Sequence, residues 1–267
     1  MEVQLFPNSA RPDVGLRPKR ESQRPLLPQH ARHCPVLEAG SSLGFLVYPP
    51  LEAFESFAVA FFGDGRYQFV YYFQTEQGEL APIFTIRTAL PAGGLGSALQ
   101  EVEILNTDLG MSREDAALIM RKFIVPDDLG TPTGAVTLRG ATNFRTPPGW
   151  DTVYTPVFNA IERPLPPMLV VRVETDWYKH ETEFRYVLQA GERISASRTM
   201  PIGQVFFVPR EEITLRDCTE EELEAMRQAD EEFSRQKAAT QITTSYGVPY
   251  SPHYLLESRA RQKDPPS

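Results

Sequence analysis

Short apolar runs separated by turn residues dominate the pattern of hydrophobic and polar positions along the chain. Residues 57–62 and 67–73 are two such runs, and the sequence Gly-Asp-Gly lies between them. An Asp-Gly pair between apolar runs predicts a β-hairpin. From Tyr67 onward every other residue of the second run is aromatic, so these rings share one face of the strand. Further strands are predicted over residues 43–48, 82–88, 135–138, 168–173, 181–188 and 204–208.

Two segments carry apolar residues at the spacing of an amphipathic helix. The first, residues 112–123, begins with Ser112, whose side chain can cap it, and has acids in its first turn and bases in its last. The second begins with a capping box at Thr219 and runs to about Ala239. Its other faces are polar, so we expect it to pack on the outside of a sheet.

The spacing of these elements predicts a mainly β protein, an antiparallel β-sandwich or barrel of about nine to twelve strands with two peripheral helices and extended proline-rich termini. The 267-residue length is at the upper end of what one core can hold. Residues 1–40 contain six prolines and are expected to form an extended arm with a short first strand. The β-rich core is expected over residues 41–215. A C-terminal helix and an irregular tail follow in residues 216–267.

Composition narrows the class of protein. The chain is 41% hydrophobic and 10% aromatic, which is enough for a packed core. A formal charge of −8 repels phosphate backbones, so no nucleic acid partner is expected. No run approaches the roughly 18 apolar residues of a membrane span, and the first residues do not resemble a secretory signal. Cys34 and Cys218 are the two cysteines, which fits a reducing compartment and predicts a cytoplasmic protein.

The four histidines do not form a recognised metal motif. His30 and His33 lie beside Cys34, but their spacing matches no zinc pattern. A site with two histidines and one carboxylate would need His180 to meet a distant histidine such as His253, because the usual short His-x-Asp or His-x-Glu pair is missing. Nucleotide-binding loops and the Gly-x-Ser-x-Gly nucleophile motif are also missing. We therefore predict no metal and no cofactor.

Aromatic residues at the ends of predicted strands are the best candidates for a binding site. Asp176, Trp177 and Tyr178 directly follow an apolar strand, and Trp150 ends a stiff loop that begins at Arg145. Rigid rings lose little entropy when they bind a ligand. The same rings would also suit the plugged end of a barrel.

Each polar neighbour of these rings has a candidate role. Arg145 can bind a carboxylate. Asp176 and His180 can hold an amine or move a proton. The predicted ligand-binding residues are therefore Arg145, Trp150, Asp176, Trp177, Tyr178 and His180.

Three stretches in this order resemble an uncharacterised bacterial family built on a domain of unknown function. They are residues 142–150, 173–177 and 201–209, with the sequences TNFRTPPGW, VETDW and PIGQVFFVP. The resemblance covers roughly residues 28–240, and the chain departs from the family pattern at residues 161–167 and 178–181. Some similar proteins belong to natural-product gene clusters, among them the peptide-binding proteins of crocagin-type ribosomal-peptide pathways. The resemblance implies a protein that holds a precursor peptide for modification or cyclisation.

Three functions remain open from the sequence. A binding protein would capture a precursor peptide or a small metabolite on its aromatic surface, or add a peptide strand to a sheet edge. An enzyme would be a metal-dependent β-barrel oxygenase, or a metal-free cyclase that needs one acid–base group in a shaped pocket. A structural subunit would exchange its arm or tail within a homodimer.

Overall fold

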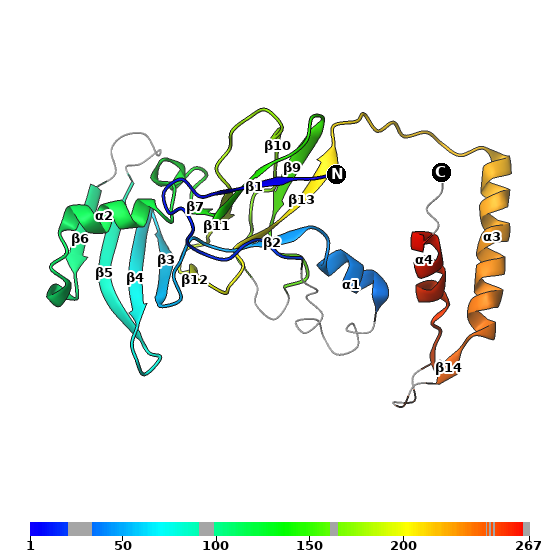
Figure 1. Cartoon of the computed structure of the whole chain (residues 1–267), viewed down its shortest axis with the longest axis horizontal. Helices are drawn as coiled ribbons and strands as arrows, with labels where there is room; N and C mark the ends of the chain where they lie inside the picture. Colours follow the sequence, from blue (N-terminus) through cyan, green and yellow to red (C-terminus); the bar gives the residue numbers. More distant parts are fainter. Residues whose placement is uncertain are drawn as a thin grey trace. The chain divides into compact units, whose positions relative to one another are not determined.

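Antiparallel sheets make up most of the chain. The computed structural model describes residues 1–20, 34–90, 99–160, 165–243, 245, 247 and 249–263, and these residues form fifteen strands and four α-helices. They divide into two units, residues 1–211 and 212–267 (Figure 1). The predicted mainly β fold is confirmed, and the sheets of the described residues pack in a sandwich-like way without closing into a barrel.

The first unit contains one five-stranded sheet in the order β12-β3-β4-β5-β6. Its β3–β4 hairpin is the predicted one, and Gly63, Asp64 and Gly65 all have positive φ, as its tight turn requires. The alternating rings of β4 lie on one face that packs into the core, where Tyr67, Phe69 and Tyr71 are buried. The strands are β12 (Arg193–Ser197), β3 (Glu55–Gly63), β4 (Arg66–Gln74), β5 (Leu80–Ala89) and β6 (Leu99–Ile104).

Smaller sheets complete the strands of this unit. A four-stranded sheet has the order β10-β9-β13-β2, and two strand pairs join β11 to β7 and β1 to β8. The four strands are β10 (Val171–Val173), β9 (Trp150–Thr155), β13 (Gly203–Pro209) and β2 (Phe45–Val47). The pairs are β11 (Glu183–Val187) with β7 (Ala135–Arg139), and β1 (Gln4–Pro7) with β8 (Thr142–Arg145).

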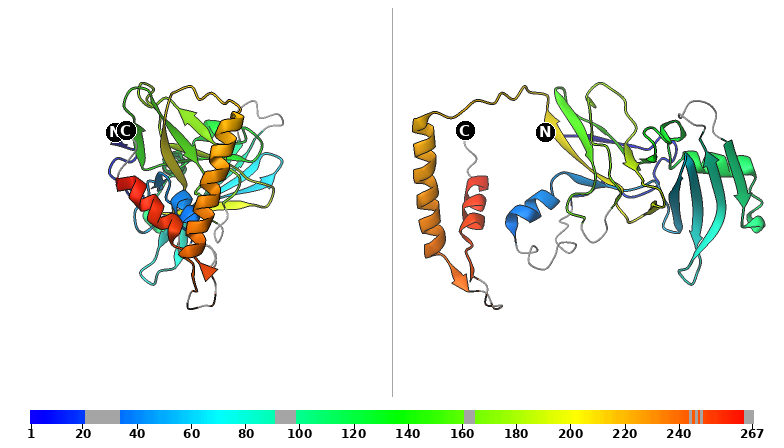
Figure 2. Two further views of the ribbon diagram at one scale, coloured as in Figure 1. Left: turned by 90° about the vertical axis from the view of Figure 1, so that its right-hand side faces the viewer. Right: turned by 180° about the vertical axis from the view of Figure 1, so that it is seen from behind.

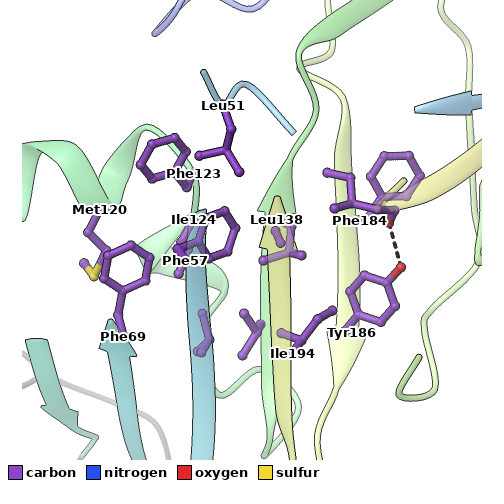
Figure 3. Close-up of a cluster of buried hydrophobic side chains, with 14 of the residues drawn as sticks. Leu51, Phe57, Phe69, Met120, Phe123, Ile124, Leu138, Phe184, Tyr186 and Ile194 are labelled. Atoms are coloured by element: carbon purple, nitrogen blue, oxygen red, sulfur yellow. Dashed lines mark hydrogen bonds between the residues drawn. The ribbon is translucent and has the colours of Figure 1, made fainter. Parts of the chain in front are cut away.

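The core lies between the five-stranded sheet, helix α2 (Arg113–Arg121) and the β7–β11 pair (Figure 3). The ring of Phe123 stacks on Phe57 at 5.3 Å and on Tyr71 at 5.7 Å between centroids. On the other side, the buried Tyr186 hydroxyl donates a hydrogen bond of 2.6 Å to the carbonyl of Ile202 (Figure 3). A buried phenol therefore has its partner in the core, as its burial requires.

Two α-helices belong to the described residues of the first unit, and the sequence predicts one of them. Helix α2 (Arg113–Arg121) has Ser112 as its cap and packs against β5 and β6. Helix α1 (Pro35–Ser41) was not predicted; it begins at a proline, which is tolerated in the first turn. Two single 3-10 turns, Thr107–Leu109 and Pro126–Asp128, flank α2.

The N-terminal segment is tied to the sheets by specific bonds. Strand β1 pairs with β8 in the register Gln4 to Arg145. The side chain of the buried Asn8 donates to the carbonyl of Gly140 at 2.8 Å. Arg11 forms an ion pair of 2.5 Å with Glu55, and the hydroxyl of Tyr71 donates to the same carboxylate. The first residues of the chain are therefore part of the packed structure.

The second unit is a helical hairpin (Figure 2). Helix α3 (Glu220–Ala239) begins at the predicted capping box on Thr219 and contacts α4 (His253–Lys263). The predicted irregular tail was wrong over α4, because Pro252 precedes this helix and does not interrupt it. Strands β14 (Ile242–Thr243) and β15 (Pro249–Tyr250) pair between the helices. Among the described residues, no helix has the length and apolarity of a membrane-crossing segment.

Candidate functional site

A cleft of about 320 Å³ lies in the first unit between β1, β8 and the segment 175–181. Four of the six predicted ligand-binding residues line it. It combines aromatic rings, two cations, a histidine and a glutamate, which is the mixture that ligand pockets of proteins use. Its lining residues are Phe6, Pro7, Ser9, Asn143, Phe144, Arg145, Thr175, Trp177, Tyr178, Lys179, His180 and Glu181.

Strands β1 and β8 form one wall of the cleft. The first three residues of β8, Thr142 to Phe144, are buried, and Arg145 at its end is exposed. The Asn143 side chain accepts a hydrogen bond of 2.8 Å from the backbone N–H of Thr182 and donates one of 2.9 Å to Glu181. Asn143 therefore joins this wall to the segment on the other side of the cleft.

The opposite wall begins with a tight turn after β10. The N–H of Tyr178 donates to the carbonyl of Glu174 at 3.0 Å, and the indole N–H of Trp177 donates to the Glu174 carboxylate. Asp176 accepts a hydrogen bond of 2.9 Å from the N–H of Gly149 and pairs with Arg210 at 2.7 Å. These bonds fix the backbone of the turn and leave the two aromatic rings exposed.

A row of rings runs from solvent into the core at this wall. Trp177 is 68% exposed and Tyr178 is 51% exposed. The Trp177 and Tyr178 centroids are 5.7 Å apart, and Tyr178 stacks on His180 at 6.0 Å with an interplanar angle of 25°. His180 in turn meets the fully buried Tyr154 edge to face at 5.6 Å. The cleft thus offers flat apolar surfaces next to a polar ring.

Burial sets the protonation of the two titratable groups beside Tyr178. Burial lowers the pKa of His180 below its ordinary value, against the opposing effect of the Glu181 charge, so the imidazole is neutral near pH 7. Burial alone would raise the pKa of Glu181, but hydrogen bonds from Ser9 and Asn143 outweigh it and lower this pKa. Glu181 is therefore an ionised carboxylate that already accepts hydrogen bonds from Ser9 and Asn143.

Two cations of the cleft have no carboxylate partner among the described residues. Arg145 and Lys179 are both exposed and take part in no ion pair there. The nearby acids, in contrast, form hydrogen bonds or ion pairs. Glu174 and Asp176 bond to Trp177 and Arg210, and Glu181 bonds to Asn143. The cleft lining carries two cations, Arg145 and Lys179, against the one carboxylate of Glu181, so its net charge is positive although the whole chain is acidic.

A cluster of ion pairs supports the turn that carries Asp176. Asp151, 2% exposed, pairs with Arg172 at 2.6 Å and with Arg210 at 2.5 Å. Burial raises the pKa of Asp151, but the hydrogen bonds from both guanidinium groups outweigh it and the net pKa is lowered. Arg210 bonds to Asp176 as well, and the two carboxylates raise the pKa of its guanidinium. Arg210 thus connects the end of β13 to the turn of the cleft.

Buried hydroxyl groups form the layer under the turn. The hydroxyl of Thr175 lies 2.9 Å from that of Thr146 and 2.7 Å from that of Thr152. Thr146 also donates to the carbonyl of Trp150 at 2.5 Å. Three threonines from separate segments therefore satisfy one another beneath the cleft, and only Thr175 lines it.

The structure brings together some predicted residues and separates others. Arg145, Trp177, Tyr178 and His180 line the cleft. The Asp176 carboxylate points to Arg210, and Trp150 starts β9, where its backbone pairs with Pro209; neither lines the cleft. The stretch from Arg145 to Trp150 was predicted as a loop, but Arg145 ends β8 and Trp150 begins β9.

Sequence reasoning missed other residues of the cleft. Lys179 had a local signal, because it lies between two predicted site residues. Ser9 and Asn143 had none, because their roles depend on the pairing of β1 with β8. His30 and His33 lie outside the described residues. Over the part of the chain that the structure describes, no three metal-binding side chains group together.

A larger and more open hollow of about 650 Å³ lies beside α2. It contains none of the predicted site residues. Its lining is the outer side of α2 and the turn before it, including Leu109, Leu118 and Lys122, and it has no aromatic ring and no histidine. Asp115, its one acid, already forms the capping box with Ser112. The cleft at Tyr178 is therefore the better candidate site, despite its smaller volume.

Comparison of the chain with protein-family models, with curated proteins and with solved structures finds no match.

Proposed function

We propose that this chain is a peptide-binding protein whose ligand occupies the cleft between β1, β8 and residues 175–181. One observation carries the proposal: the cleft gathers exposed rings and two cations that form no ion pair with other described residues. Trp177 and Tyr178 present ring faces, and Arg145 and Lys179 present charges. Their supporting bonds come from the backbone, Asp176 and Asn143, which hold the site in shape before a ligand arrives.

This mixture of groups suits a peptide. A rigid tyrosine or tryptophan ring provides large contact area at a low entropic cost, which is why such rings are frequent in peptide- and protein-binding sites. The cations supply charged hydrogen bonds to carboxylates. His180, neutral near pH 7, can both donate to and accept from a peptide group.

The motif resemblance supplies the class of peptide. On that basis the ligand is the precursor peptide of a ribosomal natural-product pathway, held for modification or cyclisation. The proposed location is the cytoplasm, where the small number of cysteines fits the reducing conditions.

Isothermal titration calorimetry on metal-stripped protein tests this function. The titrants are short peptides encoded beside the gene. We expect micromolar binding, lost at least tenfold in Trp177→Ala and in Tyr178→Ala, since each change removes a ring face from the cleft. Binding that appears only after iron or zinc is restored would favour a metal enzyme instead.

Trp150 provides the matched control. It is the other tryptophan of the chain and lies outside the cleft lining, so Trp150→Phe should bind as the wild type does. In that variant all tryptophan fluorescence comes from Trp177. A titration should therefore shift the emission of this single residue. An unchanged emission with intact binding would place the ligand elsewhere.

A second candidate function, a metal-free cyclase, is favoured by the neutral imidazole of His180 in the cleft. A histidine that is uncharged at neutral pH can accept a proton from a reacting amine. Mass spectrometry of the peptide after incubation with wild-type and His180→Gln protein distinguishes this function from binding alone. A mass change in the wild-type sample that is missing from the variant would favour the cyclase, and an unchanged peptide in both would leave binding alone.

A further inference from the structure

We propose that the cleft recognises the end of a peptide chain, and that Arg145 and Lys179 bind its free α-carboxylate. This inference rests on the proposed peptide-binding function and specifies which part of a peptide enters the site.

The first argument is the state of the charges around the cleft. Each acid near Tyr178 is engaged: Glu181 by Asn143, and Asp176 by Arg210 and the N–H of Gly149. Arg145 and Lys179 have no such partner among the described residues. The lining thus holds two cations against one carboxylate, Glu181, and a ligand anion balances the remaining positive charge.

The second argument is the placement of the two cations. Arg145 ends β8 on one wall, and Lys179 lies between two ring residues of the opposite wall. In the proposed complex, the carboxylate lies between the walls and contacts both cations. The planar guanidinium of arginine matches a carboxylate with two parallel hydrogen bonds, and lysine adds a point charge.

The third argument is size. At about 320 Å³ the cleft is at the small end of the range for ligand sites, roughly 300–1,000 Å³. A continuous peptide that passed through would need a longer groove. A chain end needs only room for its carboxylate and its last side chain, which can pack against the exposed rings of Trp177 and Tyr178.

The test compares two forms of one peptide library. N-acetylated tripeptides of random sequence, made without Asp and Glu, are prepared with a free C-terminal carboxylate or with a C-terminal amide. Each form is incubated with full-length protein, and the retained peptides are identified by ultrafiltration and mass spectrometry. We expect the acids to bind at least about tenfold more tightly than the amides, as the loss of a charged hydrogen bond predicts.

Variants assign this preference to the cleft. The double variant Arg145→Gln, Lys179→Gln should bind the acids no better than the amides. Arg193→Gln is the matched control, because Arg193 is an exposed arginine of β12 outside the cleft. Thermal unfolding of each variant verifies that it is folded.

The outcomes distinguish failure of carboxylate recognition from failure of the proposed peptide binding. Equal retention of acids and amides would overturn carboxylate recognition and leave peptide binding in place. Retention of neither form would overturn both. A preference for acids that persists in the double variant would also overturn the proposal, because the carboxylate would then bind at another place.

Discussion

The His180 imidazole lies where the exposed rings of the cleft meet the core. It is half-buried between Tyr178 and Tyr154, and burial favours its neutral form. A histidine whose pKa is lower in the folded state binds its proton more tightly in the unfolded state. Its contribution to stability is therefore complete above the unfolded pKa of about 6.5, and it is lost as the pH falls toward the folded pKa.

The lowered pKa of His180 gives a prediction for the pH dependence of stability. The melting temperature of the wild type should fall between pH 7 and pH 5 more steeply than that of His180→Gln, which has no titrating imidazole at this position. Differential scanning fluorimetry at closely spaced pH values measures both slopes. Parallel curves for the two proteins would show that His180 is not protected from protonation by the fold.

Asp151 gives a prediction about the ion cluster. Asp151→Ala leaves Arg172 and Arg210 without their shared carboxylate, so the free energy of unfolding should fall by about 2–3 kcal/mol. Glu101→Ala breaks only an exposed pair with Arg87 and should change it by less than about 0.5 kcal/mol. Urea unfolding of both variants measures the difference. Equal effects would contradict a structural role for the buried aspartate.

At the residue scale, the sequence predicts the kinds of side chain near the cleft better than the direction in which each side chain points. The clustering of Asp176, Trp177 and Tyr178 after a strand indicated a segment that forms one wall of the cleft. It did not indicate that the Asp176 carboxylate points away, to Arg210, because β13 lies far along the chain. Trp150 was grouped with Trp177 because both lie next to loops. A position next to a loop does not show on which side of a strand a ring lies.

At the element scale, the close approach of β13 to β11 depends on a residue without a side chain. A Cβ atom at Gly203 would lie 2.0 Å from the ring of Phe184, which is fully buried. Neither ring nor backbone has room to move in a packed core.

Gly203→Ala should therefore lower the free energy of unfolding by at least about 2–3 kcal/mol. Gly40→Ala is the control, because its Cβ would have one neighbour at 3.9 Å and it lies in helix α1, so this change should be neutral or stabilising by up to about 1 kcal/mol. Thermal and urea unfolding measure both variants. A mild effect at Gly203 would contradict the packing of Phe184 against β13.

The elements that the sequence predicts are those with strong local signals. The β3–β4 hairpin has its Asp-Gly turn, and helices α2 and α3 have capping residues. Strands such as β6 and β12 were missed, because their sequences LQEVEI and RISAS are half polar and lie at the edges of the large sheet. Such strands are stabilised mainly by packing against neighbouring strands, and a single sequence does not show which strands those are.

At the scale of the whole molecule, the N-terminal segment completes the candidate site. Phe6, Pro7 and Ser9 line the cleft, and Arg11 pairs with the buried Glu55. The sequence predicted an extended arm with a short first strand. It did not predict the partner of that strand, because β1 pairs with a strand more than a hundred residues away.

Deletion of residues 2–11 should therefore abolish ligand binding and lower the melting temperature. Arg11→Ala separates the two effects: it removes the ion pair with Glu55 and leaves the cleft wall in place, so it should lower stability and retain binding. Calorimetry and thermal unfolding on the two proteins give the comparison. Unchanged binding after the deletion would show that β1 is not needed for the site.

The pairing of Gln4 with Arg145 also has a consequence for biosynthesis. The first strand leaves the ribosome early and has no partner until β8 has been made. The opposite wall comes later still, with residues 175–181. A nascent chain thus lacks a complete cleft until residue 181 has been translated, and a peptide made at the same time meets no finished site before then.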